Sequence, residues 1–126
     1  MEKERKIVNF LTKKYNQYND KHRENLNAIN ENFLLEFTWR AERAYKCAHI
    51  AYTINNILNT INEGKVQDFL VYFSGIRDNY INRLTTREVV ESSSSMIANL
   101  CSLWETYARQ ELLNIMKECI DIYLEE

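Results

Sequence analysis

The sequence predicts an all-α fold, an elongated antiparallel four-helix bundle that forms a single domain over residues 1–126. The chain contains no proline and two glycines, whereas β-sandwiches and β-barrels use both residue types in their many tight turns. Apolar residues recur at three- and four-residue spacing along most of the chain, which is the period of amphipathic helices. The composition, 45% hydrophobic and 27% charged, is typical of a folded globular protein. We therefore expect two shorter and two long helices, in one bundle or as paired helical hairpins in a dimer.

The first expected helix covers residues 2–18. Ile7, Leu11 and Tyr18 follow a helical apolar period. Glu2 and Glu4 lie in the first turn, where negative charge is favourable to the helix dipole. The polar segment 16–20 that follows predicts a turn.

The second expected helix is long and covers residues 20–62. Its apolar residues follow a heptad-like pattern that Arg40 interrupts, namely Phe33, Phe37, Ala44, Cys47, Ala51, Ile54, Leu58 and Ile61. Because Ala44, Ala48 and Ala51 are small, another backbone could approach this stretch closely. Gly64 then predicts the end of the helix, because glycine favours the position after a helix C-terminus.

Two further helices are expected over residues 66–84 and 86–124. Gly75 lies inside the first of them and indicates a bend or a bulky neighbour. Thr85 and Glu88 have the spacing of a capping box at the start of the second. The serine run 92–95 continues the helical pattern, so we expect it to be helical, and a bend or loop between two shorter helices is the alternative.

The distribution of charge predicts self-association. Segments 47–62, 69–76 and 92–104 contain no Asp, Glu, Lys or Arg, so we expect them to form the packed centre. One bundle of this size would leave part of that apolar surface exposed, and monomers rarely tolerate a large apolar patch. We therefore expect a homodimer whose interface follows Ala44, Ala48, Ala51 and the serine run.

The amino-terminal sequence and the cysteines indicate a cytoplasmic protein. The first residues are charged and no apolar signal segment follows them. No stretch is apolar and long enough to span a bilayer, so we expect no membrane partner. Cys47, Cys101 and Cys119 are odd in number and lie in apolar helical patterns, which predicts buried free thiols in a reducing compartment.

The sequence offers no recognisable catalytic or metal-binding motif. Neither histidine, His22 or His49, follows a Glu at the spacing of a di-metal carboxylate bundle, and no Cys-x-x-Cys occurs. We expect no metal, no cofactor and no catalytic residue. The leading hypothesis is a non-enzymatic protein–protein interaction module, such as an adaptor, an inhibitor or an assembly subunit.

Trp39, Arg40 and Arg43 are the candidate partner-binding residues. Trp39 lies on neither apolar stripe of the second helix and is close to both arginines in sequence. Trp and Arg are enriched among the residues that dominate binding energy at protein interfaces. Ordinary packing of Trp39 against the first helix is the alternative.

Nucleic-acid binding is the alternative function, because the amino terminus is basic. Residues 1–23 carry a net charge of +4 and the rest of the chain −6. Basic and aromatic side chains together can hold phosphates and stack on bases, and the candidates are Lys3, Arg5, Lys6, Lys13, Lys14, Tyr15 and Tyr18. The same charges could instead balance the acidic remainder, within the chain or across a dimer.

Arg43 and His49 are separated by five residues. This pair resembles the Arg-x(4–6)-His motif of HEPN ribonucleases, which are small dimeric helical bundles. The resemblance implies RNA cleavage by these two residues. Ala44 stands where that family usually has a polar residue after the arginine.

Overall fold

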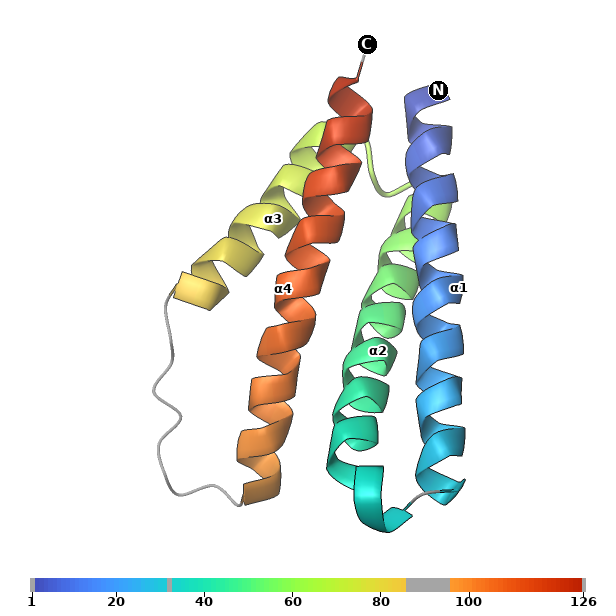
Figure 1. The fold of residues 1–126 in the computed structure, drawn as a ribbon. Coiled ribbons are helices and arrows are strands. Elements are labelled where there is room, and N and C mark those ends of the chain that lie inside the picture. Colours follow the sequence, from blue (N-terminus) through green and yellow to red (C-terminus); the bar gives the residue numbers. More distant parts are fainter. Residues whose placement is uncertain (1, 32, 86–95, 126) are drawn as a thin grey trace.

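The structure, a computed structural model, describes the backbone of residues 2–31, 33–85 and 96–125. Side chains are described for residues 2–27, 40–84 and 102–125. Four helices, α1 (Glu2–Glu31), α2 (Phe33–Asn62), α3 (Phe69–Thr85) and α4 (Met96–Leu124), contain more than three-quarters of the chain. Successive helices run in opposite directions, and both termini lie at one end of the bundle (Figure 1). The predicted all-α four-helix bundle is confirmed, with three long helices and one short helix instead of two of each.

α1 is longer than predicted, because the polar segment 16–20 is helical and not a turn. The second helix, predicted over 20–62, begins only at Phe33, because residues 20–31 belong to α1. Tyr18 within this segment packs against the core. Further along the same face, Asn25 is 6% exposed, and its side-chain amide donates to the Lys21 carbonyl at 2.7 Å. Packing of this face therefore outweighs the turn preference of the asparagines and Asp20 on the opposite side.

Gly64 ends the α2 segment as predicted. It has a φ of 73°, the left-handed conformation that glycine adopts without strain. The Gly64 amide donates to the Ile61 carbonyl at 3.0 Å and the Lys65 amide to the Thr60 carbonyl at 3.2 Å. This pair of bonds is a Schellman motif, which satisfies carbonyls that a helix end leaves without a partner.

α3 begins at Phe69, three residues later than predicted, because Asp68 caps it. One Asp68 carboxylate oxygen accepts a bond from the Val71 amide at 3.2 Å, the geometry of an N-cap. Gly75 contacts no bulky neighbour, since a Cβ built there would meet no atom within 4 Å. The predicted capping box of Thr85 and Glu88 lies outside the described residues.

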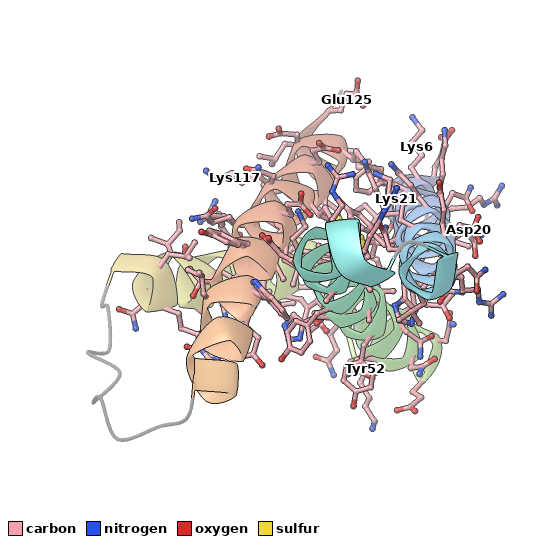
Figure 2. The ribbon with its side chains drawn as sticks, turned by 60° about the horizontal axis from the view of Figure 1, so that its bottom comes forward. Lys6, Asp20, Lys21, Tyr52, Lys117 and Glu125 are labelled. Carbon is pink, nitrogen blue, oxygen red and sulfur yellow. The ribbon has the colours of Figure 1, made fainter. Side chains whose placement is uncertain are left out.

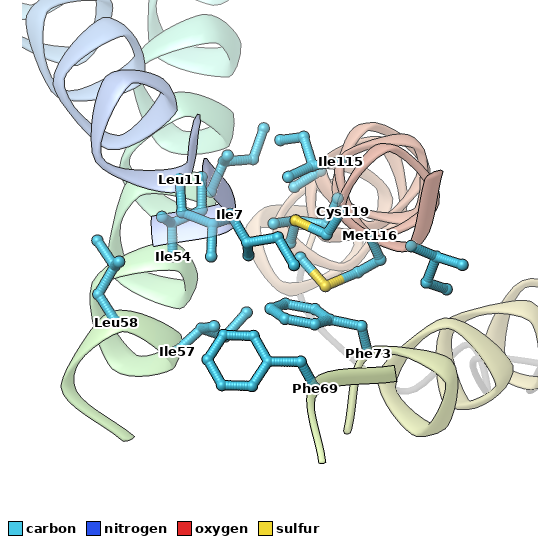
Figure 3. Close-up of a cluster of buried hydrophobic side chains, with 14 residues drawn as sticks. Ile7, Leu11, Ile54, Ile57, Leu58, Phe69, Phe73, Ile115, Met116 and Cys119 are labelled. Carbon is cyan, nitrogen blue, oxygen red and sulfur yellow. The ribbon is translucent and has the colours of Figure 1, made fainter. Parts of the chain in front are cut away.

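The core joins all four helices in the half of the bundle that holds the termini. Figure 3 shows Phe69 and Phe73 of α3 beside Met116 of α4 and Ile57 of α2, with Ile7 across the cluster. Phe73 is 1% exposed and Ile7 and Met116 are fully buried. The predicted packed segments 47–62 and 69–76 both contribute to this core.

In the described part of α4, the core residues lie beyond the charge-free segment 92–104. They occur between Ala108 and Ile120, among charged residues that face outward. Leu103, at the end of the charge-free segment, is 45% exposed. The side chains of residues 92–101, most of that predicted packed segment, lie outside the described residues.

The alanine stripe of α2 is covered by α1 within one chain. α1 and α2 form the most extensive helix pair. Ala44 and Ala51 are buried, and the His22 Nδ1 of α1 lies 3.1 Å from the Ala44 carbonyl oxygen, to which it donates. The expected placement of a dimer interface along Ala44, Ala48 and Ala51 is therefore wrong, because α1 occupies that face. The serine run, the other part of that expected interface, lies outside the described residues.

Candidate functional site: the α2–α3 groove

A groove lies between α2 and α3, because α3 packs along α4 and not along α2. Figure 1 shows the carboxyl end of α3 diverging from the other helices. The groove has a volume of about 330 Å³. Both helices contribute its lining, which comprises Thr53, Asn56, Ile57, Thr60, Tyr72, Ile76, Asn79, Tyr80 and Arg83. We refer to these nine residues as the α2–α3 groove.

The α2 wall of the groove is a row of hydrogen-bonding side chains at helical spacing. The Thr53 hydroxyl donates to the His49 carbonyl at 2.9 Å, and the Thr60 hydroxyl donates to the Asn56 carbonyl at 2.8 Å. Each hydroxyl proton is thereby used, which leaves the hydroxyl oxygen as an acceptor. The amide of Asn56 is exposed at the edge of the groove.

The α3 wall carries two half-buried tyrosines and one arginine. Burial raises the pKa of Tyr72, and a hydrogen bond with Thr60 opposes the shift. Burial also raises the pKa of Tyr80, while the positive charges of Arg109 and Arg83 oppose that shift. Both phenols are therefore neutral at physiological pH and can donate or accept hydrogen bonds.

Arg83 is the charged residue of the groove lining. Its Nε donates to the Asn79 Oδ1 at 3.1 Å, one turn earlier on α3. Among the described residues, no carboxylate lies within 4 Å of Arg83. This end of the groove therefore carries positive charge that its neutral neighbour Asn79 does not compensate.

A polar contact between α2 and α4 lies next to the groove. The Tyr45 hydroxyl donates to Glu105 Oε1 at 2.8 Å, and its ring lies 5.7 Å from the Trp104 ring. Glu105 also forms an ion pair with Arg109 at 3.7 Å. Burial lowers the pKa of His49, which Glu105 partly opposes, so His49 is neutral at physiological pH.

The three candidate partner-binding residues of α2 do not form one described surface. Arg40 Nη1 donates to the Asn25 Oδ1 of α1 at 3.0 Å, so this guanidinium connects two helices. Arg43 is exposed. The side chain of Trp39 lies outside the described residues.

Arg43 and His49, the pair that resembles the HEPN motif, point in different directions. Six residues on a helix correspond to a rotation of about 240°, which leaves the two side chains about 120° apart. Arg43 lies near Cys47, where its charge opposes the burial that raises the thiol pKa, while His49 lies near Glu105 and Arg109 of α4. The two side chains therefore have different surroundings.

Several basic side chains of α1 lie over aromatic rings of this chain. Lys3 Nζ is 5.6 Å from the centre of the Tyr123 ring, Lys14 Nζ is 5.7 Å from Phe10, and Lys21 Nζ is 5.4 Å from Tyr18.

Tyr15 and Tyr18 also pack against the core, so neither ring is a fully exposed stacking platform. Arg5, Lys6 and Lys13 are exposed. Figure 2 shows Lys6 and Lys21 with the acidic Asp20 on the same helix.

A second polar layer lies where α1, α2 and α4 meet. Lys46 Nζ is 3.3 Å from Glu111 Oε1. Burial, followed by the charge of Glu111, raises the pKa of Tyr18 to about 12. Burial also raises the pKa of the Cys47 thiol, although Lys46 opposes that shift. Tyr18 and Cys47 are therefore both neutral at physiological pH.

The described cysteines are buried free thiols, as predicted for these two positions. Burial raises the pKa of Cys119 to about 12. A thiol is a nucleophile or a metal ligand only as a thiolate, and burial disfavours that form at both Cys47 and Cys119. Cys101 has no described side chain.

The structure adds two observations on metals and membranes. Within the described residues, no three His, Cys, Asp or Glu side chains form a group that could hold a metal ion. None of the described helices has an apolar stretch long enough to cross a bilayer.

Sequence reasoning missed the groove. Tyr72, Ile76, Asn79 and Arg83 do recur at helical spacing, which places them on one face of α3. This spacing shows that the four residues share a face of α3. It does not show which helix that face lies against, because the position of α3 depends on packing between distant residues.

Comparison with known proteins adds no relative. No family model, no curated protein and no solved structure matches the chain.

Proposed function

We propose that this chain is a non-enzymatic protein–protein interaction module of the cytoplasm, and that it binds its partner in the α2–α3 groove. The observation that supports this proposal is the composition of the groove walls. Tyrosine and arginine dominate binding energy at protein interfaces, and tyrosine and asparagine are typical of antibody paratopes. Tyr72, Tyr80, Asn56, Asn79 and Arg83 bring these residue types together from two helices.

The shape of the groove also supports a polypeptide occupant. It is an open channel between two helices, so a segment can enter from the side. Its apolar surface comes from Ile57, Ile76 and the two tyrosine rings, and its hydrogen-bonding groups from the flanking amides and hydroxyls. A small number of placed polar groups on an apolar lining is the arrangement that gives binding sites their specificity.

Blocking the groove tests this proposal. A phage library of random peptides is selected on the whole wild-type protein, and the recovered peptides are measured against two variants. Asn56→Trp places a bulky ring in the groove, whereas Asn59→Trp places the same ring on an exposed site of α2 outside the groove lining. We expect Asn56→Trp to abolish binding and Asn59→Trp to leave it unchanged. Equal binding to both variants, or recovery of no peptide, would overturn the proposal.

Nucleic-acid binding through α1 is the second candidate. Arg5, Lys6 and Lys13 are exposed and can reach a phosphate backbone. Affinity that comes from phosphate contacts falls steeply with salt. A titration of RNA and DNA at low and at physiological salt therefore tests this function, and absence of binding at low salt would exclude it.

A further inference from the structure

We infer that the α2–α3 groove binds an extended polypeptide segment and that Arg83 binds a carboxylate of this segment. This inference rests on the proposed function and specifies the chemistry of the partner.

The charge of the groove points to an acidic ligand. Arg83 is the charged side chain of the lining, and its contact in the described structure is with the neutral Asn79 amide. Arg77, the other arginine near it on α3, differs because it lies 3.1 Å from the Asp78 carboxylate. A carboxylate from a partner would supply Arg83 with a counter-charge that none of the described residues places within ion-pair distance.

The Asn79 contact also orients the Arg83 guanidinium. A hydrogen bond to Nε fixes the plane of the guanidinium group and leaves the two Nη groups as donors. Two parallel bonds from a guanidinium to a carboxylate are among the strongest charge-assisted pairs in proteins. Lysine lacks this planar pair of donors and would not replace arginine at such a site.

A second guanidinium, that of Arg109 of α4, also lies near Tyr80 on the α3 wall. Arg109 of α4 and Arg83 both act on the Tyr80 phenol between them in the direction that favours its anion. Glu105 pairs with Arg109 at 3.7 Å and accepts the Tyr45 hydroxyl, so its negative charge lies on the α2–α4 side. An acidic side chain bound beside Tyr80 would therefore meet the charge of Arg83, whereas the charge of Arg109 is shared with Glu105.

The two walls favour an extended segment over a helix. A helix satisfies its own backbone groups and binds through an apolar face. An extended segment brings unpaired N–H and C=O groups, and the groove offers amides at Asn56 and Asn79 and hydroxyls at Thr53 and Thr60. These side chains can pair with main-chain groups, while Ile76 and the two tyrosine rings can contact side chains of the segment.

Charge reversal at Arg83 tests the inference with the peptides recovered in the selection. Arg83→Glu should weaken their binding by roughly tenfold to a hundredfold, which corresponds to the loss of a hydrogen bond to a charged group. Arg83→Gln should weaken binding in the same direction by a smaller factor. Arg77→Glu makes the same charge change on α3 outside the groove lining and should have little effect. Peptides in which the acidic residue is replaced by lysine should regain affinity for Arg83→Glu.

The outcomes separate this inference from the proposed function. Peptides that lose binding to Asn56→Trp but bind Arg83→Glu as tightly as the wild type would overturn the inference and support the groove. Recovered sequences with no enrichment of Asp or Glu would also overturn it. Circular dichroism of each variant shows whether its helix content is that of the wild type. If Arg83→Glu does not fold, Arg83→Gln and the sequence enrichment still decide the question.

Discussion

The two glycines of this chain have different backbone surroundings. Replacing each with alanine should therefore change the free energy of unfolding in opposite directions. Gly64 has a φ of 73°, where a Cβ is strained, so Gly64→Ala should lower the free energy of unfolding by roughly 1–2 kcal/mol. Gly75 lies inside α3 with open space around it, so Gly75→Ala should raise that free energy by roughly 0.5–1 kcal/mol. Urea unfolding followed by circular dichroism measures both, and a shared sign would contradict these assignments.

The half-buried Tyr18 phenol predicts a loss of stability at alkaline pH. Its pKa is about 12 in the folded protein against 10.0 as the ordinary value. The unfolded chain therefore releases this proton first, so the stabilisation is complete below pH 10 and is lost as pH rises through about 12.

With Tyr18→Phe, the free energy of unfolding should decline less steeply with pH between about 10 and 12 than in the wild type. Tyr52→Phe, at an exposed position, is the matched control. An identical slope for Tyr18→Phe and the wild type would show that Tyr18 ionises alike in both states.

Single residues also show what the sequence could reveal. The left-handed glycine at position 64 and the buried thiols of Cys47 and Cys119 followed from residue type and local pattern. Arg40 was recognised as an interruption of an apolar stripe. Its partner, Asn25 of α1, could not be identified, because that contact depends on how two helices align.

Alignment of α1 with α2 depends on a buried polar pair, and the next prediction tests it. Asn25 accepts from Arg40 at 3.0 Å and donates to the Lys21 carbonyl. Asn25→Ala removes both bonds and should lower the free energy of unfolding by roughly 1–3 kcal/mol. Asn27→Ala, at an exposed position of the same helix, should change it by less than about 0.5 kcal/mol. Equal effects in thermal or urea unfolding would refute a stabilising role for the Asn25–Arg40 contact.

At the scale of elements, the sequence was reliable where packing and local signals agreed. The end of α2 was predicted because Gly64 and the end of the apolar pattern coincide. The turn at 16–20 was predicted wrongly because its residues favour turns locally, whereas Tyr18 and Asn25 bury the same helix face. α3 begins later than its apolar pattern predicts, because Asp68 caps the helix and the apolar Val66 lies before this cap.

The oligomeric state is a property of the whole molecule, and the structure changes where an interface is expected. α1 covers the alanine stripe, whereas Leu103 and Tyr107, one turn apart on α4, are 45% and 37% exposed. We expect the homodimer predicted from the sequence to bury these two residues, so light scattering should give twice the 15.1 kDa chain mass. Leu103→Glu should restore the monomer mass. A monomer mass for the wild type at micromolar concentration would contradict self-association.

The groove could not be predicted from the sequence, because it is a consequence of the arrangement of all four helices. Phe69 and Phe73 hold the amino-terminal half of α3 in the common core. α3 packs along α4 and not along α2, and its carboxyl end diverges from the other helices (Figure 1). The residues of both walls were visible as polar and aromatic positions at helical spacing. The sequence does not show which helices those positions face.

Amide chemical-shift mapping by NMR tests the central claim most directly. A peptide recovered in the selection is titrated into the isotope-labelled, full-length protein. We expect the largest perturbations at residues 53–60 of α2 and 72–83 of α3, including the Nε resonance of Arg83. Unchanged resonances in these two segments, with perturbations instead along residues 2–23 of α1 or residues 102–110 of α4, would contradict binding in the groove.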